Sequence, residues 1–241
     1  MIVGSFLNVC IHRLPLRESV MWPSSRCPHC RAQLKPYDNI PVVSYLMLRG
    51  RCRSCGNAIS AQYPIIELLT GILFFSAFML FDPPLLYQRL LFACAMVVLF
   101  VIDLEHRILP DVITLPGIIL GLIFSFFLPP GWLDSLIGLV VGGGSLWLMG
   151  EIYFRLRHEE GMGFGDVKML AMIGAFLGWK LMLLTLVLSS FIGSIVGVAM
   201  IVLKRGDMKY ALPFGTFLAV GALVAAVAGD RIVSWYASFY Y

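Results

Sequence analysis

Charged side chains are scarce in this sequence, since Asp, Glu, Lys and Arg make up 13% of its residues against about 25% in an ordinary soluble domain. This scarcity excludes the usual water-soluble globular classes. The hydrophobic fraction is 59%, and the mean hydropathy is +0.87. The composition therefore predicts a membrane protein.

The N-terminus lacks the marks of a signal peptide, because no basic region precedes its apolar run and no small-residue cleavage site follows it. Residues 1–11 are apolar but too few to cross a bilayer, which takes about 20 residues. We interpret residues 1–12 as the remnant of a first transmembrane helix.

Seven further apolar segments follow residue 63, at about 64–81, 86–103, 111–128, 133–154, 167–178, 181–203 and 211–228. Their short joints carry helix-stop residues, such as Pro129-Pro130-Gly131 and Gly178-Trp179-Lys180. The run 167–178 is shorter than a full span, so it is either a short helix shielded by its neighbours or one that starts deep in the membrane. The predicted fold is an all-α polytopic membrane protein of about eight transmembrane helices, the first one truncated.

A polar segment, residues 13–63, interrupts this pattern and contains two CxxC pairs, Cys27 with Cys30 and Cys52 with Cys55. The pairs are separated by 21 residues, one more than the usual spacing of paired zinc knuckles. Four thiolates complete a tetrahedral zinc shell, and the metal supplies folding energy that a small polar insert lacks. A filled shell leaves no open position, so we expect structural rather than catalytic zinc.

Two disulfides are the alternative for these four cysteines, and they would require an oxidising compartment. The distribution of Lys and Arg across the membrane distinguishes zinc binding from disulfides. If the spans alternate across the membrane, fifteen of the eighteen basic residues lie on the side of the cysteine segment, and three, Arg89, Lys180 and Arg231, lie on the other. The positive-inside rule then predicts a cytoplasmic cysteine segment, where thiols stay reduced.

Two aspartates stand at the ends of apolar segments, where a charge is costly and indicates function. Asp103 ends one helix and Asp166 begins another, and the alternation of spans puts both at the cytoplasmic leaflet. Two neighbouring carboxylates can share one proton and activate a water molecule. Gly163 and Gly165 beside Asp166 would let an extended peptide approach closely. The pattern predicts an intramembrane aspartyl protease.

The helix ends suggest different roles for the two acids, because a helix N-terminus carries partial positive charge and a C-terminus partial negative charge. We expect Asp166 to accept a proton from water and Asp103 to hydrogen-bond the scissile carbonyl. Among the other acids, Asp111 is interpreted as a helix N-cap, and Glu67 as a satisfied interfacial group or a partner of the site. Lys168 is interpreted as an interfacial anchor or as the neighbour of a carboxylate.

The sequence resembles the type IV prepilin peptidases, the bifunctional leader peptidases and N-methyltransferases among the GxGD aspartyl proteases. The resemblance spans nearly the whole chain, and the matching motifs are GSFLNVCIHRLP at 4–15, the two CxxC pairs, YPIIELLTG at 63–71, DLEHRILPD at 103–111 and GMGFGDVK at 161–168. It implies that Asp103 and Asp166 are the catalytic aspartates. It also implies cleavage of prepilins or pseudopilins on the cytoplasmic side, after a Gly and usually before Phe, in pilus or type II secretion systems.

The resemblance further implies methylation of the new N-terminus from S-adenosylmethionine. The chain has no glycine-rich dinucleotide fingerprint that would place the methyl donor. The expected domains are the helix remnant 1–12, a cytoplasmic zinc domain 13–63 and an intramembrane protease domain 64–241. We expect a multi-pass protein of the bacterial inner membrane, with the bilayer and prepilins as partners and no nucleic acid.

A proton- or cation-coupled transporter is the alternative function, since it would also use paired acids. It should show internal repeats and polar groups near the middle of the bilayer. The sequence shows neither feature.

Overall fold

The computed structural model describes residues 1–22, 26–27, 29–33, 36–159, 163–203 and 212–239. In these ranges the secondary structure consists of helices and two isolated β-bridges. The all-α prediction is therefore confirmed. The chain divides into two compact units, unit 1 (residues 1–81) and unit 2 (residues 82–241).

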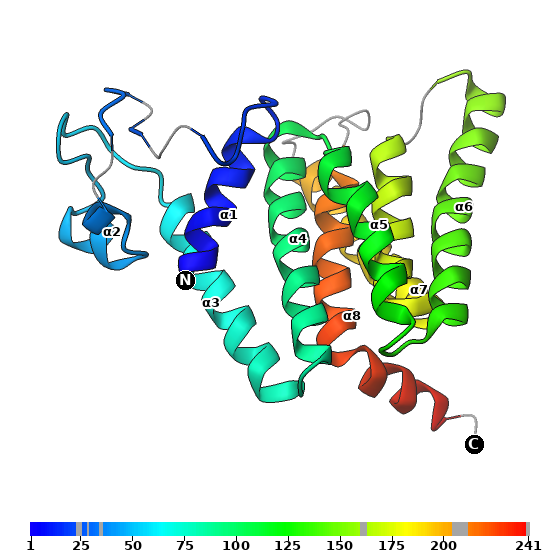
Figure 1. The fold of residues 1–241 in the computed structure, drawn as a ribbon. Coiled ribbons are helices and arrows are strands. Elements are labelled where there is room, and N and C mark those ends of the chain that lie inside the picture. The colour runs from blue at the N-terminus through cyan, green and yellow to red at the C-terminus, as the bar shows by residue number, and fades with distance from the viewer. Residues whose placement is uncertain (23–25, 28, 34–35, 160–162, 204–211, 240–241) are drawn as a thin grey trace. The chain divides into compact units, whose positions relative to one another are not determined.

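In unit 1 the short helix α1 (Ile2–Arg13) packs on the longer, apolar helix α3 (Gln62–Leu80) (Figure 1). Between them the described residues form a 3₁₀ turn (Pro36–Asn39), the short helix α2 (Val43–Met47) and two cysteine knuckles, which are closed by the β-bridges Arg26–Gln33 and Arg51–Ala58. At Gly4 of α1 a Cβ atom would lie 2.8 Å from the backbone of Glu67. Because glycine occupies this position, the two helices can touch through their backbones.

The described residues of unit 2 form a bundle of five helices, α4 (Leu85–His106), α5 (Asp111–Ser125), α6 (Trp132–Arg157), α7 (Phe164–Val202) and α8 (Phe214–Ala237). Gly178 interrupts α7 with φ +77°, so that two helical arms meet there. The sequence predicted this break, because 167–178 and 181–203 were separate apolar segments. Since an L side chain rarely adopts such a φ, glycine permits the turn between the arms.

The first arm of α7 forms the centre of unit 2, and its residues from Met169 to Gly178 are buried. α5, α6 and α8 all pack against α7. Of the two options for this short segment, the structure therefore shows a helix shielded by its neighbours. The arm lies so close to α6 that a Cβ atom at Gly174 would overlap the carbonyl oxygen of Gly138, the small-residue contact typical of membrane helices.

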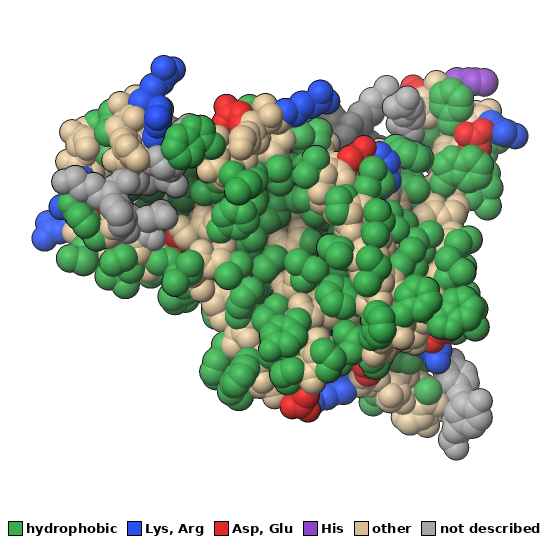
Figure 2. Space-filling model, viewed as in Figure 1, with side chains coloured by type: hydrophobic (Ala, Val, Ile, Leu, Met, Phe, Trp, Pro, Cys, Tyr) green, Lys and Arg blue, Asp and Glu red, His purple; other side chains and the backbone are tan. Residues whose placement is uncertain are grey.

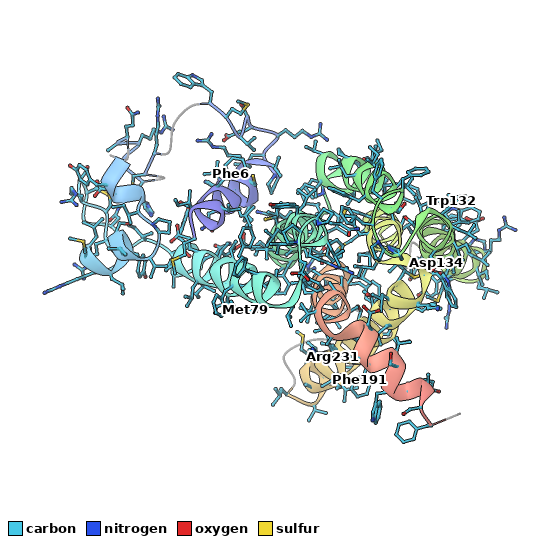
Figure 3. The ribbon with its side chains drawn as sticks, turned by 60° about the horizontal axis from the view of Figure 1, so that its bottom comes forward. Phe6, Met79, Trp132, Asp134, Phe191 and Arg231 are labelled. Carbon is cyan, nitrogen blue, oxygen red and sulfur yellow. The ribbon has the colours of Figure 1, made fainter. Side chains whose placement is uncertain are left out.

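The outer surface of the helices is apolar. Four large side chains labelled in Figure 3, Phe6, Met79, Trp132 and Phe191, are each more than half exposed. Figure 2 shows hydrophobic side chains over the middle of unit 2, with charged side chains gathered at its two ends. Among the described residues, five helices are long and apolar enough to cross a membrane, including the 39-residue α7, and α5 is shorter with 15 residues. With its two arms α7 supplies two of the predicted segments, which matches the expected count of about eight helices.

Candidate active site and metal centre

Asp103 lies in the last turns of α4 and is held by the first turn of α8. The backbone N–H of Thr216 donates a hydrogen bond to Asp103 Oδ2 at 2.6 Å, and the Thr216 hydroxyl donates a second one to the same oxygen at 3.0 Å. The side chain of Asp103 is 5% exposed. Two donors therefore occupy Oδ2, so that Oδ1 is the oxygen available to a reacting group.

Asp166 lies in the first turn of α7, at the same end of unit 2. Its backbone N–H donates to the carbonyl of Gly163, the residue that precedes the helix with extended backbone angles. Asp166 is 9% exposed, and its carboxylate interacts electrostatically with that of Asp103. The structure thus brings together the two acids that the sequence singled out, from positions 63 residues apart.

Leu109 packs between α7 and α8, against a glycine of each helix. A Cβ atom at Gly165 in α7 would lie 2.9 Å from Leu109 Cβ, and one at Gly215 in α8 would lie 3.0 Å from Leu109 Cδ1. The same added Cβ atom at Gly215 would also lie 3.0 Å from Asp103 Oδ2. Both glycines therefore serve the close packing of α7 and α8 around Leu109.

The predicted N-cap role of Asp111 is wrong. Asp111 is the first residue of α5, where Pro110 occupies the cap position without a side-chain cap bond. Both carboxylate oxygens of Asp111 instead accept hydrogen bonds from Lys168 Nζ, at 2.7 and 2.8 Å. Lys168 is thereby committed to a carboxylate outside the dyad, and the pair fastens the start of α5 to the start of α7.

Sequence analysis did not identify Thr216, Gly215 or Leu109 as parts of the site. Thr216 acts from a helix that begins more than 100 residues after Asp103. The available signal was the Pro213-Phe214-Gly215 step, which starts an apolar helix on the same side as both acids. Gly161, the first glycine of the GMGFGDVK motif, lies outside the described residues.

The four predicted zinc ligands come together in unit 1. The sulfur atoms of Cys27, Cys30, Cys52 and Cys55 all lie within 4.8 Å of one another. Cys27 and Cys55 are 3.9 Å apart at sulfur, and Cys30 and Cys52 are 4.0 Å apart. Tetrahedral zinc with bonds of about 2.3 Å would separate its sulfur ligands by about 3.8 Å. These separations are too long for disulfides and fit a metal shell.

Backbone hydrogen bonds close each cysteine knuckle. The N–H of Cys27 donates to Ala32, and the N–H of Cys52 donates to Asn57, so the two loops repeat one geometry. The backbone N–H groups of Cys55 and Ser54 lower the pKa of the Cys52 thiol to about 7. A thiolate is the form that binds metal. The lowered pKa increases the thiolate fraction of Cys52 and so favours its role as a metal ligand.

Comparison with known proteins agrees with the division into two units. The bacterial peptidase A24 N-terminal domain matches residues 1–81, and the type IV leader peptidase family matches residues 90–198. No solved structure matches.

Curated relatives are similar over most of the chain. A prepilin leader peptidase/N-methyltransferase of Stutzerimonas stutzeri is 38% identical over 99% of this chain and 91% of its own length. One of Dickeya chrysanthemi is 38% identical over 94% and 89%, and one of Myxococcus xanthus is 43% identical over 83% and 60%. With this coverage and identity, the chain belongs to the type IV leader peptidase family.

Proposed function

We propose that this protein is an intramembrane aspartyl endopeptidase that removes the leader of type IV prepilins or pseudopilins, with Asp103 and Asp166 as its catalytic pair. The observation that carries the proposal is the meeting of the two buried carboxylates at one end of unit 2. Family membership supports the same activity. It gives no support to the alternative of a coupled transporter.

The mechanism requires one carboxylate to activate water and the other to polarise the peptide carbonyl. Asp166 takes a proton from the attacking water, and the oxygen of that water forms a bond to the carbonyl carbon. Asp103 gives a hydrogen bond, and then its proton, to the carbonyl oxygen. Collapse of the tetrahedral intermediate breaks the C–N bond. The leaving amine takes up the proton held by Asp166, and the former carbonyl oxygen returns its proton to Asp103, so that a carboxylic acid and an amine are released.

Thr216 supports this division of roles through its position. Its two hydrogen bonds end on Oδ2 of Asp103, so a proton carried by Asp103 sits on Oδ1 and points away from Thr216. Thr216 is accordingly a positioning residue, because it orients a reacting group without touching the substrate.

Gly163 and Gly165 are proposed to lie beside the substrate. The extended backbone of Gly163, at φ −69° and ψ 134°, suits pairing with an extended peptide. Gly165 has its Cβ direction filled by Leu109, so its contribution is to bring α7 close enough for the acids to meet. The expected cut follows a Gly and usually precedes Phe.

The proposed orientation places the zinc domain and both acids on the cytoplasmic side of a bacterial inner membrane. The count of basic residues on the two sides supports it. The short basic leader of a prepilin would then meet the active site from the cytoplasm.

Methylation of the new N-terminus is the second proposed activity, with S-adenosylmethionine as the methyl donor. The names of the relatives support it. The four clustered cysteines are proposed to hold structural zinc, which would fasten residues 26–33 to residues 51–58.

The test is incubation of the purified chain in lipid with a prepilin peptide, followed by mass spectrometry. Asp103→Asn and Asp166→Asn should each abolish cleavage after the leader Gly. Asp134→Asn is the matched control, since Asp134 lies in the first turn of α6, and α6 starts at the end of unit 2 opposite to that where α4 finishes and α7 begins (Figure 1). Cleavage that survives either catalytic replacement would overturn the aspartyl mechanism.

A further inference from the structure

A charged side chain that the cleavage mechanism does not use is buried near the start of α4. Arg89 is 8% exposed, and the Nε and Nη1 atoms of its guanidinium are buried. Basic side chains near the ends of membrane helices usually extend to the aqueous interface. The guanidinium of Arg89 is instead enclosed by protein, so an interfacial anchor does not account for it.

A charge partner of Arg89 is Asp230 in α8, with which it interacts electrostatically. α4 and α8 pack against each other. They run antiparallel, because Asp103 near the end of α4 meets Thr216 in the first turn of α8. The two helices are therefore joined by polar contacts near both ends of their interface, with the catalytic contact at one end and the pair of Arg89 and Asp230 at the other.

The two contacts are equally spaced on both helices. Arg89 precedes Asp103 by 14 residues in α4, and Asp230 follows Thr216 by 14 residues in α8. At a rise of about 1.5 Å per residue, each separation is about 21 Å. A single axial register of α8 along α4 therefore satisfies both contacts.

The apolar residues between these contacts specify that register only weakly. Buried residues of α4 recur with heptad spacing, at Arg89, Phe92, Met96, Leu99 and Asp103. α8 contributes one leucine and three alanines to the same buried cluster, Leu218, Ala219, Ala222 and Ala225. Small, repeated side chains look alike after a shift, whereas a polar residue at a core position of paired helices fixes their register. The charged residues at the two ends of the α4 stripe thus distinguish one register from the next.

We propose that Arg89 and Asp230 are positioning residues, which set the axial register of α8 along α4 and thereby hold Thr216 on Asp103. The inference rests on the proposed peptidase function. Packed helices shift past each other by up to about one turn, about 5.4 Å. Such a shift would carry the N–H and the hydroxyl of Thr216 beyond hydrogen-bond reach of Asp103 Oδ2.

The contact between Thr216 and Asp103 is poorly suited to hold this register alone during turnover. In the proposed mechanism Asp103 alternates between acid and carboxylate, and hydrogen bonds to the charged form are the stronger ones. The strength of the contact therefore changes in each catalytic cycle. Arg89 and Asp230 take no part in the proton transfers, so their attraction stays constant.

The start of α4 is itself held in place. Gln88, the residue before Arg89, is buried, and its Nε2 donates a hydrogen bond to the carbonyl of Phe176 in α7 at 3.3 Å. This bond ties the start of α4 to the central arm of unit 2. Arg89 is thus mounted on a fixed element and can serve as a reference for the position of α8.

Hydrogen exchange followed by mass spectrometry tests the register in the full chain without reference to activity. The first four N–H groups of a helix lack partners within it, so the protection of the Thr216 N–H depends on Asp103. Asp230→Asn removes the charge from an exposed residue and opens no cavity. It should speed exchange in the first turn of α8 about fivefold or more, and leave residues 218–226 within about twofold. An equal increase along the whole of α8 would show general destabilisation and would overturn the proposal.

Steady-state cleavage of a prepilin peptide gives a second readout. Asp230→Asn should lower kcat about 3- to 30-fold, because small misplacements from distant replacements slow catalysis. KM should stay within about twofold, since Asp230 does not touch the substrate. In the Thr216→Val background the same replacement should lower kcat by a smaller factor, because one of the bonds that it positions is already absent. Fully multiplicative effects would overturn the link between the two contacts.

Replacements of Arg89 separate its charge from its packing. Arg89→Met keeps an unbranched apolar side chain and should reproduce the effects of Asp230→Asn, whereas Arg89→Lys keeps the charge and should retain most of kcat. Arg231→Met is the matched control, since Arg231 is an exposed arginine of α8 next to Asp230 (Figure 3), and both readouts should stay near those of the unchanged chain. Normal exchange and normal kcat in both Arg89→Met and Asp230→Asn would overturn the proposal.

The two readouts also distinguish failure of this inference from failure of the proposed function. A chain that cleaves prepilin, but whose first turn of α8 exchanges normally in Asp230→Asn, would refute the register assignment and leave the peptidase intact. A chain that cleaves nothing, but shows the expected local increase in exchange, would support the register assignment and refute the peptidase.

Discussion

In unit 1 a few polar contacts hold the described residues between α1 and α3, whereas in unit 2 the helices pack around a continuous buried core. In unit 1 the attachments are the four cysteines and single bonds such as Val42 to Glu67. In unit 2 the core is a cluster of sixteen buried apolar residues, and its helices approach through glycines. Loss of one attachment should therefore be severe in unit 1, while unit 2 should lose stability in smaller steps.

Zinc removal should have the largest effect and should destabilise unit 1 much more than unit 2. Cys52→Ser removes one thiolate, and structural zinc sites contribute about 10–16 kcal/mol of apparent binding energy. We expect loss of bound metal and rapid proteolysis within residues 14–61, while the helices of unit 2 stay protected. Limited proteolysis with mass spectrometry measures this difference.

The matched control is Cys94→Ser, which changes a cysteine of α4 that is not part of the cluster. Metal content should stay unchanged in that variant. Equal loss of protection in both units after zinc removal would contradict the contrast between them.

Thr216→Val should have the next largest effect. It tests whether the loss of one polar contact also has a large effect, here on the rate of cleavage, in unit 2. It removes the hydroxyl donor to Asp103 and keeps the backbone N–H. Asp103 becomes a carboxylate as it gives its proton to the carbonyl oxygen, and hydrogen bonds to a charged group contribute about 1.5–3 kcal/mol, so kcat should fall about 10- to 100-fold. KM should change less than twofold, because Thr216 does not touch the substrate.

Steady-state cleavage of a prepilin peptide gives both constants for this variant. Thr216→Ser keeps the hydroxyl and should restore most of the rate. A serine variant as slow as the valine one would show that the lost methyl packing, and not the hydrogen bond, caused the effect.

Gly174→Ala should destabilise unit 2 by about 1–3 kcal/mol, the usual cost of overpacking. The new methyl group would overlap the carbonyl oxygen of Gly138, so α6 and the first arm of α7 must separate. Thermal unfolding in detergent measures the loss. Gly150→Ala in α6 faces open space and should be neutral or stabilising, by up to about 1 kcal/mol.

Asp111→Asn should have the smallest effect. Its ion pair with Lys168 is largely exposed on the Asp111 side, and such pairs contribute about 0.2–1 kcal/mol. A double-mutant cycle with Lys168→Met measures the coupling. A coupling above about 2 kcal/mol would show that polar attachments are as important in unit 2 as in unit 1.

The sequence was sufficient for the parts of this protein that depend on local patterns. Apolar runs predicted the helices, Gly178-Trp179-Lys180 predicted the break in α7, and the CxxC spacing predicted the sulfur cluster. These features follow from residues close together in the chain. The meeting of Asp103 and Asp166 was also predicted, because alternation of spans is a simple rule that relates distant segments.

Features that depend on how distant helices pack were not predictable in this way. The bond from Thr216 to Asp103 requires the angle and depth at which α8 meets α4. The same limit explains the error at Asp111, where a reachable lysine on α7 competed successfully with the local cap position. Glu67 was interpreted as a satisfied interfacial group or a partner of the site, but its contact with Val42 depends on a strained backbone that no propensity indicates.

Leu109 gives the catalytic pair a mechanical property that its hydrogen bonds alone would not. Its side chain fills the space at Gly165 and Gly215, one on each of the helices that bear or hold an aspartate. Close-packed interiors have low compressibility, so the spacing of the two acids is set by a volume of hydrocarbon. The nearly incompressible Leu109 side chain thereby fixes the distance between the two carboxylates. Shortening it would let both Asp103 and Asp166 move.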